Sequence, residues 1–250
     1  MKLLLVSTPR SGNTWFRQML CGALHLREFA VHRPCDLHWA ELPSRCIVQM
    51  HWRAKPDVWK ISQDFGFRPI TIVRHPLDVL ISILHFCNFE LETNRWLDGE
   101  GGDETSIRWK KPTDPAFAAY ATGPRAAALL SVSAAWMEQK IPHVRFEELV
   151  ANTELALRNF LTQLAVESLE PFSGVIGDNT LEEMRSHSVN HHFWQGTPGL
   201  WSRLIDRDLA NRIHAAHADT FTSLAYGIEE ARSVPPEESW KVWSALRAKP

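Results

Sequence analysis

Short apolar runs mark the strands that this sequence predicts. Lys2–Val6, Cys46–Met50 and Pro69–Val73 are largely apolar and are bounded by polar residues or proline. Such runs are typical of parallel strands that are buried on both faces of a sheet. Ile141–Phe146 predicts a fourth, shorter strand.

Segments with apolar residues at helical spacing lie between and after these strands. The segments that predict helices are Asn13 to about His25, Leu77–Phe86, Gly123–Lys140, Glu147–Ala165, Thr180–Ser186 and Asp206–Ala225. Pro76 stands at the first turn of the second of these, a position that favours proline. The alternation of strand and helix predicts an α/β fold, in which a parallel sheet has helices on both faces.

Three segments interrupt this alternation. Residues 88–112 contain the run Asp98-Gly99-Glu100-Gly101-Gly102-Asp103, and connections of this length usually cover a ligand, bind one or are disordered. Residues 187–201 are rich in aromatic residues and glycine, and the tail 233–250 has two prolines followed by an amphipathic piece. The chain has no internal repeats. We therefore expect a single domain over residues 1–250, with a loop at 88–112 and a C-terminal tail at 233–250.

The composition excludes several classes of protein. The chain has 250 residues, of which 44% are hydrophobic and 22% charged, and a net charge of −2. These values argue against disorder and provide no global basic field for nucleic acid. The opening MKLLLVS is too short for a signal peptide or a membrane span, and no later stretch is long enough. We expect neither nucleic acid nor membrane as a partner, although Arg10, Arg17 and Arg74 could form a local basic pocket.

The cysteines indicate a reducing compartment. Cys21, Cys35, Cys46 and Cys87 show neither a CxxC motif nor paired spacing. We expect reduced, mostly buried thiols in a cytoplasmic protein. No cluster of His and Cys has the spacing of metal ligands, so no metal site is expected.

The turn between the first strand and the first helix has the composition of an anion site. It reads Ser7-Thr8-Pro9-Arg10-Ser11-Gly12-Asn13-Thr14-Trp15. Backbone N–H groups and the helix dipole at such a turn favour an anion. Arg10 adds charge, while Ser11, Asn13 and Thr14 add neutral donors. The alternative is an ordinary turn in which Ser or Asn caps the helix.

The same turn resembles the loop of PAPS-dependent sulfotransferases that binds the 5′-phosphosulfate of 3′-phosphoadenosine 5′-phosphosulfate (PAPS). That loop commonly reads Pro-(Lys/Arg)-Ser-Gly-Thr-Thr-Trp, and a Walker A motif is absent from this sequence. The resemblance implies a cofactor role for each residue from Arg10 to Trp15. Arg10 would contact the transferred sulfuryl group, Ser11, Gly12, Asn13 and Thr14 would hold the 5′-phosphate, and Trp15 would stack on adenine.

A second motif begins at the end of the third predicted strand. Arg74-His75-Pro76-Leu77-Asp78-Val79-Leu80-Ile81-Ser82 matches the family pattern Arg-(Asn/Asp/His)-Pro-x-Asp-x-x-x-Ser at every fixed position. By this resemblance Arg74 and Ser82 would bind the 3′-phosphate, whereas a lone Arg at a strand end would more often be a surface ion pair. We expect Asp78 to be a structural partner.

The end of the second predicted strand carries a candidate base. It reads Gln49-Met50-His51, where the family often has Lys-Thr-His. The pKa of an imidazole is near neutrality, so His51 could accept the proton that an acceptor hydroxyl loses. The alternatives are a structural histidine at this position and a carboxylate base. The rival carboxylates are Glu41, Asp57 and Asp64.

Resemblance continues in the second half of the chain. Val144–Leu149 is similar to a strand end of the family and is expected to be core, as is Trp136. The segment 193–201 resembles the cofactor-covering loop Arg-Lys-Gly-x-x-Gly-x-Trp through Gly196, Gly199 and Trp201. Trp194-Gln195 replaces its Arg-Lys pair, so Arg203 or backbone amides would have to bind the 3′-phosphate instead. Leu181 stands where many members carry an aromatic residue that packs on adenine.

These motifs predict a sulfotransferase of P-loop-like α/β fold that moves a sulfuryl group from PAPS to a hydroxyl or amine. His51 would act as base and Arg10 would stabilise the leaving phosphate, with PAP as product and no metal. The acceptor wall would combine the Trp52 region, residues 86–109 and residues 191–194, whose aromatic residues favour a small molecule. A P-loop nucleoside or nucleotide kinase and a non-catalytic PAP-binding protein are the alternatives. The dimer motif of the family is not recognisable after Trp201, so the oligomeric state is open.

Overall fold

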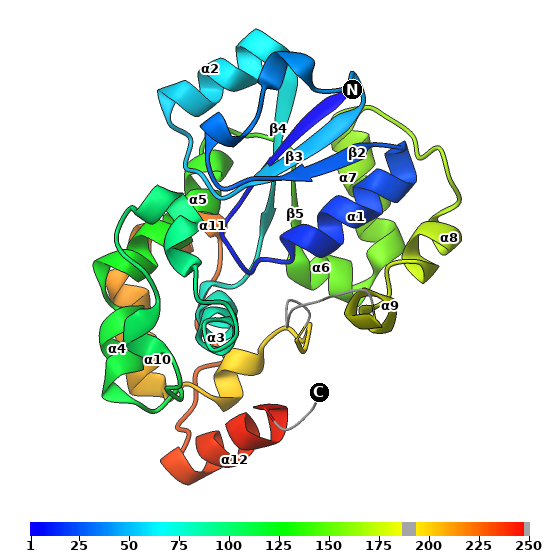
Figure 1. The fold of residues 1–250 in the computed structure, drawn as a ribbon. Coiled ribbons are helices and arrows are strands. Elements are labelled where there is room, and N and C mark those ends of the chain that lie inside the picture. The colour runs from blue at the N-terminus through cyan, green and yellow to red at the C-terminus, as the bar shows by residue number, and fades with distance from the viewer. Residues whose placement is uncertain (187–193, 248–250) are drawn as a thin grey trace. The chain divides into compact units, whose positions relative to one another are not determined.

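The computed structural model describes residues 1–186 and 194–247. The chain forms two compact units (Figure 1). The first comprises residues 1–74 and 131–189, and the second comprises residues 75–130 and 190–250. A parallel sheet is the centre of the first unit, and the described part of the second is built from helices and turns.

The sheet of the first unit has five strands in the order β2-β3-β1-β4-β5. Its strands are β1 (Lys2–Val6), β2 (Arg27–Ala30), β3 (Cys46–Met50), β4 (Phe67–Val73) and β5 (His143–Arg145). All neighbouring strands are parallel, with β1 in the middle. The carboxyl ends of β1, β3 and β4 therefore meet at one edge, which is where ligands bind in open α/β sheets.

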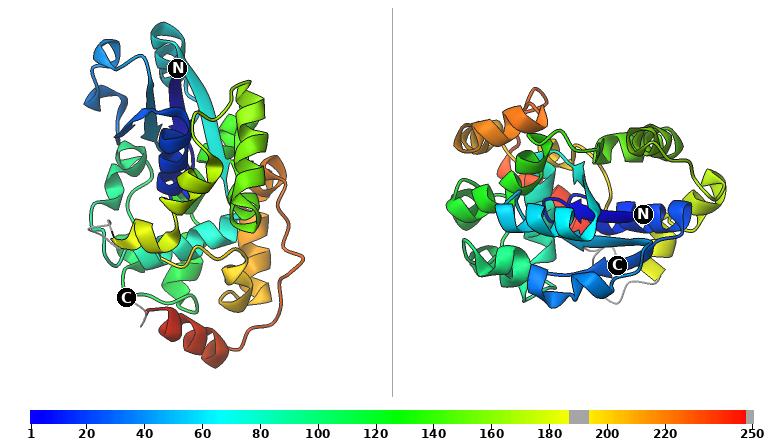
Figure 2. Two further views of the ribbon diagram at one scale, coloured as in Figure 1. Left: turned by 90° about the vertical axis from the view of Figure 1, so that its right-hand side faces the viewer. Right: turned by 90° about the horizontal axis from the view of Figure 1, so that it is seen from above.

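Helices cover both faces of this sheet (Figures 1 and 2). The connections β1–α1–β2 and β3–α2–β4 cross the sheet in opposite directions, so right-handed crossovers place α1 (Asn13–Leu24) and α2 (Pro56–Phe65) on opposite faces. On the α1 face, buried Phe16 and Met19 join Leu3, Ile47 and Ile70 in one core. The predicted fold class is confirmed.

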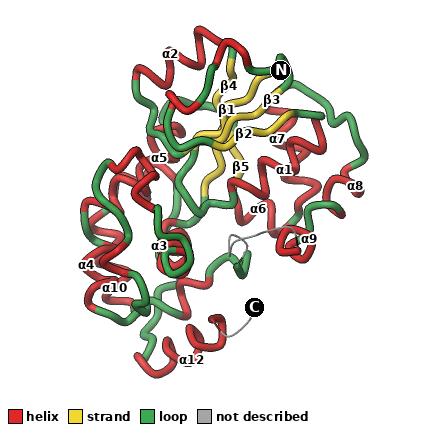
Figure 3. Tube along the Cα trace, in the orientation of Figure 1, coloured by secondary structure: helices red, strands yellow, loops and turns green. Residues whose placement is uncertain are grey.

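Four more helices complete the first unit. They are α6 (Phe146–Ala151), α7 (Thr153–Leu164), α8 (Phe172–Gly177) and α9 (Leu181–Ser186). The sequence predicted one helix over residues 147–165, but the structure has two, α6 and α7, which Figure 3 labels separately. They are divided at Asn152. The Asn152 side chain accepts a hydrogen bond from the Leu155 N–H at 3.1 Å and so caps α7.

The second unit is helical in its described part. Its helices are α3 (Pro76–Phe86), α4 (Pro115–Ala121), α10 (Arg207–Ala216), α11 (Ala218–Leu224) and α12 (Pro236–Arg247), and α5 (Pro124–Met137) begins here and ends in the first unit. The helix predicted over residues 206–225 is divided into two at His217. The imidazole Nε2 of His217 bonds to the Ala121 carbonyl at 2.7 Å, which fixes the break.

Residues 88–112 are anchored by a buried ion pair. The segment contains the 3-10 helices η3 (Thr93–Gly99) and η4 (Thr105–Ile107). Glu104 is fully buried, and its carboxylate lies 2.8 Å from the guanidinium of Arg125. Arg125 also donates to the Thr93 and Glu100 carbonyls at 3.0 and 2.6 Å, and the Tyr120 hydroxyl donates to Glu104 at 3.0 Å. The carboxylate therefore lies inside a saturated hydrogen-bond network.

Several elements of the first unit, among them β2 and α2, were not predicted from the sequence. β2 is an edge strand whose residues are mostly exposed, so it has no apolar run. α2 places only Val58 and Ser62 among its buried residues, and its pattern is correspondingly weak. Among the described residues, no helix is both long and apolar enough to cross a bilayer.

Candidate functional site

The turn between β1 and α1 is held in a conformation that requires glycine at one position. Gly12 has φ 96°, and Arg10 also has a positive φ, of 67°. A Cβ on Gly12 would lie 2.6 Å from the Cδ2 atom of Phe146, well inside van der Waals contact. Both the backbone conformation and the packing therefore exclude a side chain here.

Side chains of the turn itself fix its path. The Asn13 amide donates to the Thr8 carbonyl at 2.9 Å and contacts the Ser7 hydroxyl through a short hydrogen bond. The Thr8 N–H donates to the hydroxyl of Ser133, on α5, at 2.8 Å. The side chain of Asn13 is thus engaged inside the turn, and the group it can offer an anion is its backbone N–H at the start of α1.

Ser11 places a buried hydroxyl in this turn. Its side chain is 1% exposed, and its hydroxyl has no hydrogen-bond partner among the residues that the structure describes. A buried hydroxyl without a partner is costly, and such an atom is explained when a ligand supplies the missing bond. Ser11 therefore fits the expected contact to an oxyanion.

Arg10 and Arg74 lie close together at the ends of β1 and β4. The Arg74 Nη1 donates to the Arg10 carbonyl at 3.1 Å, and its guanidinium lies 4.4 Å from the ring centre of Phe146. Burial, together with repulsion from Arg74, lowers the pKa of Arg10 to about 9. Both arginines are protonated at neutral pH, so a bound anion would relieve their repulsion.

His51 lies at the end of β3, where its ring is fixed by the turn. Its Nδ1 bonds to the Ser7 carbonyl at 2.8 Å. Because a carbonyl only accepts, Nδ1 carries the proton and Nε2 is the basic nitrogen. Burial lowers the pKa of His51 to about 4, with further lowering by His32, Arg10 and Arg17, although the Ser7 bond opposes the shift. His51 is therefore neutral at pH 7.

The rival carboxylates and Arg17 have other surroundings. Arg17 donates to Glu28 at 2.8 Å and to Gln49 at 2.6 Å, so it is engaged with β2 and β3. Asp64 pairs with Lys60 on α2 at 2.9 Å, and Asp57 is exposed in the first turn of that helix.

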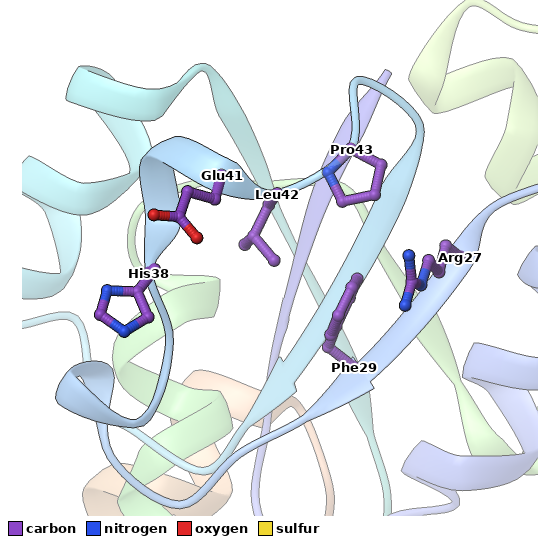
Figure 4. A pocket seen from close by; sticks show the side chains of 6 residues that line it. All are labelled: Arg27, Phe29, His38, Glu41, Leu42 and Pro43. Atoms are coloured by element: carbon purple, nitrogen blue, oxygen red, sulfur yellow. The ribbon is translucent and has the colours of Figure 1, made fainter.

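The third rival carboxylate, Glu41, lines a shallow pocket of about 230 Å³ beside the edge strand β2 (Figure 4). Figure 4 shows Arg27 and Glu41 at opposite ends of this pocket, with apolar side chains between them. Its lining residues are Arg27, Phe29, His38, Glu41, Leu42 and Pro43. None of them belongs to the turn or to the ends of β1 and β4, so the pocket is separate from the candidate site.

In the second unit, His75 and Asp78 contact the turn at residues 199–201. His75 accepts from the Leu77 N–H at 3.2 Å, which caps α3, and its ring stacks on Trp201 at 5.0 Å. The buried Asp78 carboxylate accepts from the backbone N–H groups of Gly199 and Trp201 at 2.7 and 3.0 Å. The expected structural role of Asp78 is confirmed.

The other predicted cofactor residues of the second unit have different environments. Ser82 is buried on α3, and Gly196 has φ 62° in the loop that precedes Gly199. Arg203 ends the 3-10 helix η5 (Leu200–Arg203) and is exposed. Trp194, which replaces a cationic residue of the family pattern, stacks on His85 at 4.0 Å. The predicted wall residues 191–193 lie outside the described part of the chain.

Comparisons with known proteins identify the fold. No protein-family model matches the chain, and no curated protein is significantly similar to it in sequence. Many solved structures resemble it, and three of them serve as examples. Mouse sulfotransferase SULT7A1 complexed with PAP is 15% identical, with a TM-score of 0.65 over 88% of this chain and 84% of that chain.

The second is a retinol dehydratase in complex with androsterone and PAP, which is 11% identical, with a TM-score of 0.55 over 94% of this chain and 83% of that chain. The third is the sulfotransferase domain from the curacin biosynthetic pathway, which is 16% identical, with a TM-score of 0.50 over 93% of this chain and 98% of that chain. The chain has the sulfotransferase fold. At these identities the likeness shows the fold, and the chemistry must be argued from the site.

Within this sulfotransferase fold, three supporting residues were missed at the sequence level. Phe146 was expected only as core, yet it contacts both the Gly12 position and the Arg74 guanidinium. The Asn179 carbonyl accepts from the Trp15 indole at 2.8 Å and orients the ring expected to meet adenine. Ser133 is a serine in an alanine-rich helix, and its sequence carries no signal for its contact with Thr8. Trp136, expected as core, is fully buried.

Proposed function

We propose that this protein is a sulfotransferase that transfers a sulfuryl group from PAPS to a hydroxyl or amine of a small molecule. The observation that carries the proposal is the group formed by the buried Ser11 hydroxyl, Arg10 and Arg74 at the ends of β1 and β4. These groups suit an anion, and the neutral His51 is fixed against the same turn. The PAP bound to two of the structural neighbours supports the choice of nucleotide.

Two groups of residues, called here the 5′ grip and the 3′ grip, would bind the two ends of the nucleotide. Arg10, the hydroxyl of Ser11 and the backbone N–H groups from Gly12 to Thr14 would bind the 5′-phosphosulfate at the start of α1. Trp15 would stack on adenine. The 3′-phosphate would be bound by Arg74 with Ser82, and Gly196 and Arg203 would belong to the covering loop. The proposal assigns no role to a metal.

His51 is the proposed base. As the acceptor oxygen or nitrogen bonds to sulfur, the bond between sulfur and the 5′-phosphate oxygen breaks and PAP leaves. The acceptor proton passes to Nε2 of His51, because Nδ1 already holds a proton on the Ser7 carbonyl. Arg10 stabilises the charge that develops on the leaving phosphate. A bound dianion raises the pKa of His51 and makes it a stronger base than in the free protein.

Three further assignments complete the proposal. We propose that both units together form one sulfotransferase domain, since the Arg74–Ser82 motif continues from one into the other. A cytoplasmic location is proposed from the four free cysteines, of which Cys35 is exposed. A small-molecule acceptor is supported by the androsterone and retinol bound to structural neighbours.

The first test is the substitution His51→Ala. We expect turnover of PAPS with an acceptor library to fall by about 10²–10⁴-fold, the usual contribution of a general base, while PAP affinity stays within about threefold of wild type. His25→Ala is the matched control, because His25 is exposed and pairs only at the surface with Glu170. Unchanged turnover in His51→Ala would overturn the assignment of the base. PAP binding by a wild-type protein that consumes no PAPS would instead indicate a binding protein.

A further inference from the structure

The hydrogen-bond ladder between β1 and β4 ends before the two strands reach the site. The register pairs Leu5 with Ile70, and the next residues continue toward Thr8 and Ile72. The Ser7 N–H points the other way, toward β3, and donates to the Met50 carbonyl at 3.4 Å. Since successive amides of a strand point in opposite directions, the Thr8 N–H faces β4. In a continued parallel ladder it would donate to the Ile72 carbonyl.

The hydroxyl of Ser133 is inserted at this position of the ladder. It accepts from the Thr8 N–H at 2.8 Å and donates to the Ile72 carbonyl at 3.1 Å. The Ser133 N–H in turn bonds to the Thr8 hydroxyl at 3.2 Å. Ser133 is 1% exposed, so water does not compete for these bonds. One side chain on α5 thus takes the place of a direct bond between the strands.

This insertion separates the ends of the two strands. A ladder bond holds N and O about 2.9 Å apart, whereas two bonds through a hydroxyl hold them much farther apart. Arg10, the first residue of the proposed 5′ grip, follows Thr8 by two residues, and Arg74 likewise follows Ile72 by two residues. Across the widened gap, Arg74 reaches back to the Arg10 carbonyl at 3.1 Å. The Ser133 hydroxyl therefore lies between the two strand ends that lead to Arg10 and Arg74.

We propose that Ser133 is a positioning residue that sets the distance between the 5′ grip and Arg74 of the 3′ grip, and so selects a nucleotide with phosphates at both ends. The inference rests on the proposed function. Ser133 does not itself contact the nucleotide in this account. Without its hydroxyl, the Thr8 N–H and the Ile72 carbonyl close into a direct ladder bond. The grips then move together, and a ligand held at both ends is affected more than a ligand held at one.

The test compares PAP with AMP, which has only the 5′-phosphate, on wild type and Ser133→Ala by calorimetry. In Ser133→Ala we expect PAP affinity to fall by about tenfold or more, in line with the loss of a buried hydrogen-bonding group. We expect AMP affinity to fall by less than about threefold, because AMP is bound only by the 5′ grip. Ser133→Thr keeps the hydroxyl and is expected to restore the preference for PAP. A purely structural role would weaken both ligands equally and would not distinguish them.

Ser62→Ala is the matched control. Ser62 is also buried, and its hydroxyl bonds to the Phe67 carbonyl at 2.7 Å, at the opposite end of β4. We expect this variant to lose stability with no change in the ratio of PAP to AMP affinity. If Ser133→Ala does not fold, Ser133→Cys, with a much weaker hydrogen-bonding group, must lower the ratio.

Two results would count against the proposal. An unchanged ratio of PAP to AMP affinity in a folded Ser133→Ala protein, including equal losses for the two ligands, overturns the role of Ser133 and leaves the proposed function standing. Failure of the wild-type protein to bind PAP contradicts the proposed function itself, and the inference with it.

Discussion

At the scale of single residues, two groups of the site have pKa values below their ordinary ranges. Burial is the main cause for both, and positive neighbours add to it. The pKa of His51 falls to about 4, and that of Arg10 falls to about 9. Between these values His51 is a neutral base and Arg10 a cation, which is the pair of charge states that the proposed chemistry needs.

This pair predicts a broad pH profile. In the free enzyme, kcat/KM should fall below about pH 4 as His51 is protonated and above about pH 9 as Arg10 loses its proton. The acid limb of kcat should lie higher than that of kcat/KM, because a bound anion favours protonated His51. Steady-state kinetics with PAPS across this range provides the measurement.

An NMR titration of the histidine rings gives the control for this profile. The His51→Ala variant assigns the His51 signal among the 12 histidines of the chain. A His51 ring that titrates near the ordinary value of 6.5 would contradict the proposed lowering of its pKa.

The lowered pKa of His51 also affects the stability of the fold. Between about pH 4 and 6.5 the unfolded chain binds the proton and the folded chain does not, so stability should fall as pH is lowered through this window.

At the scale of elements, the 88–112 segment depends on a buried ion pair. Glu104 accepts from Arg125 and Tyr120 and has no exposed surface. The hydroxyl of Tyr120 has its pKa raised well above the ordinary value by burial and by the Glu104 carboxylate, so it remains a donor. This network explains why a connection of this length has an ordered path across η3 and η4.

Removing one charge from this network should release the segment. We expect Glu104→Gln to lower the free energy of unfolding by about 3–5 kcal/mol, because it leaves the Arg125 guanidinium buried without its counter-charge. Limited proteolysis should then cut within residues 88–112 first, and wild type should resist at the same protease concentration. Glu154→Gln is the control, since Glu154 forms an exposed pair with Arg158 on α7. Equal resistance of Glu104→Gln and wild type would show that the pair is not what orders the segment.

At the scale of the whole molecule, the sequence predicted the elements whose signal lies in a few consecutive residues. β1, β3 and α3 follow from buried apolar runs and from Pro76, and they occur where they were expected. β2 could not be found in this way, because an exposed edge strand has no apolar signature. The breaks at Asn152 and His217 depend on single side-chain contacts that helical periodicity does not encode.

The candidate site likewise has some residues that the sequence reveals and others that it does not. The turn from Arg10 to Trp15 and the Arg74–Ser82 segment are contiguous motifs, so they could be found in the sequence. Ser133 and Phe146 reach the site through contacts between residues far apart in the chain. Such residues become visible only when the fold brings the elements together, and their roles were therefore missed or reduced to core packing.

Because the net charge of the molecule is negative, binding of an anionic nucleotide depends on the cationic side chains of the site. The chain carries a net charge of −2, so it repels a polyanionic nucleotide at long range, and binding must come from the site itself. Calorimetric titration of PAP in the presence of EDTA tests whether this site binds the nucleotide. We expect one PAP to bind per chain without magnesium. We also expect Arg74→Ala to weaken this binding by about tenfold or more through the loss of charge-assisted hydrogen bonds, and Arg27→Ala, at the distant sheet edge, to leave it unchanged. Absence of PAP binding, together with magnesium-dependent binding of ATP, would contradict the account.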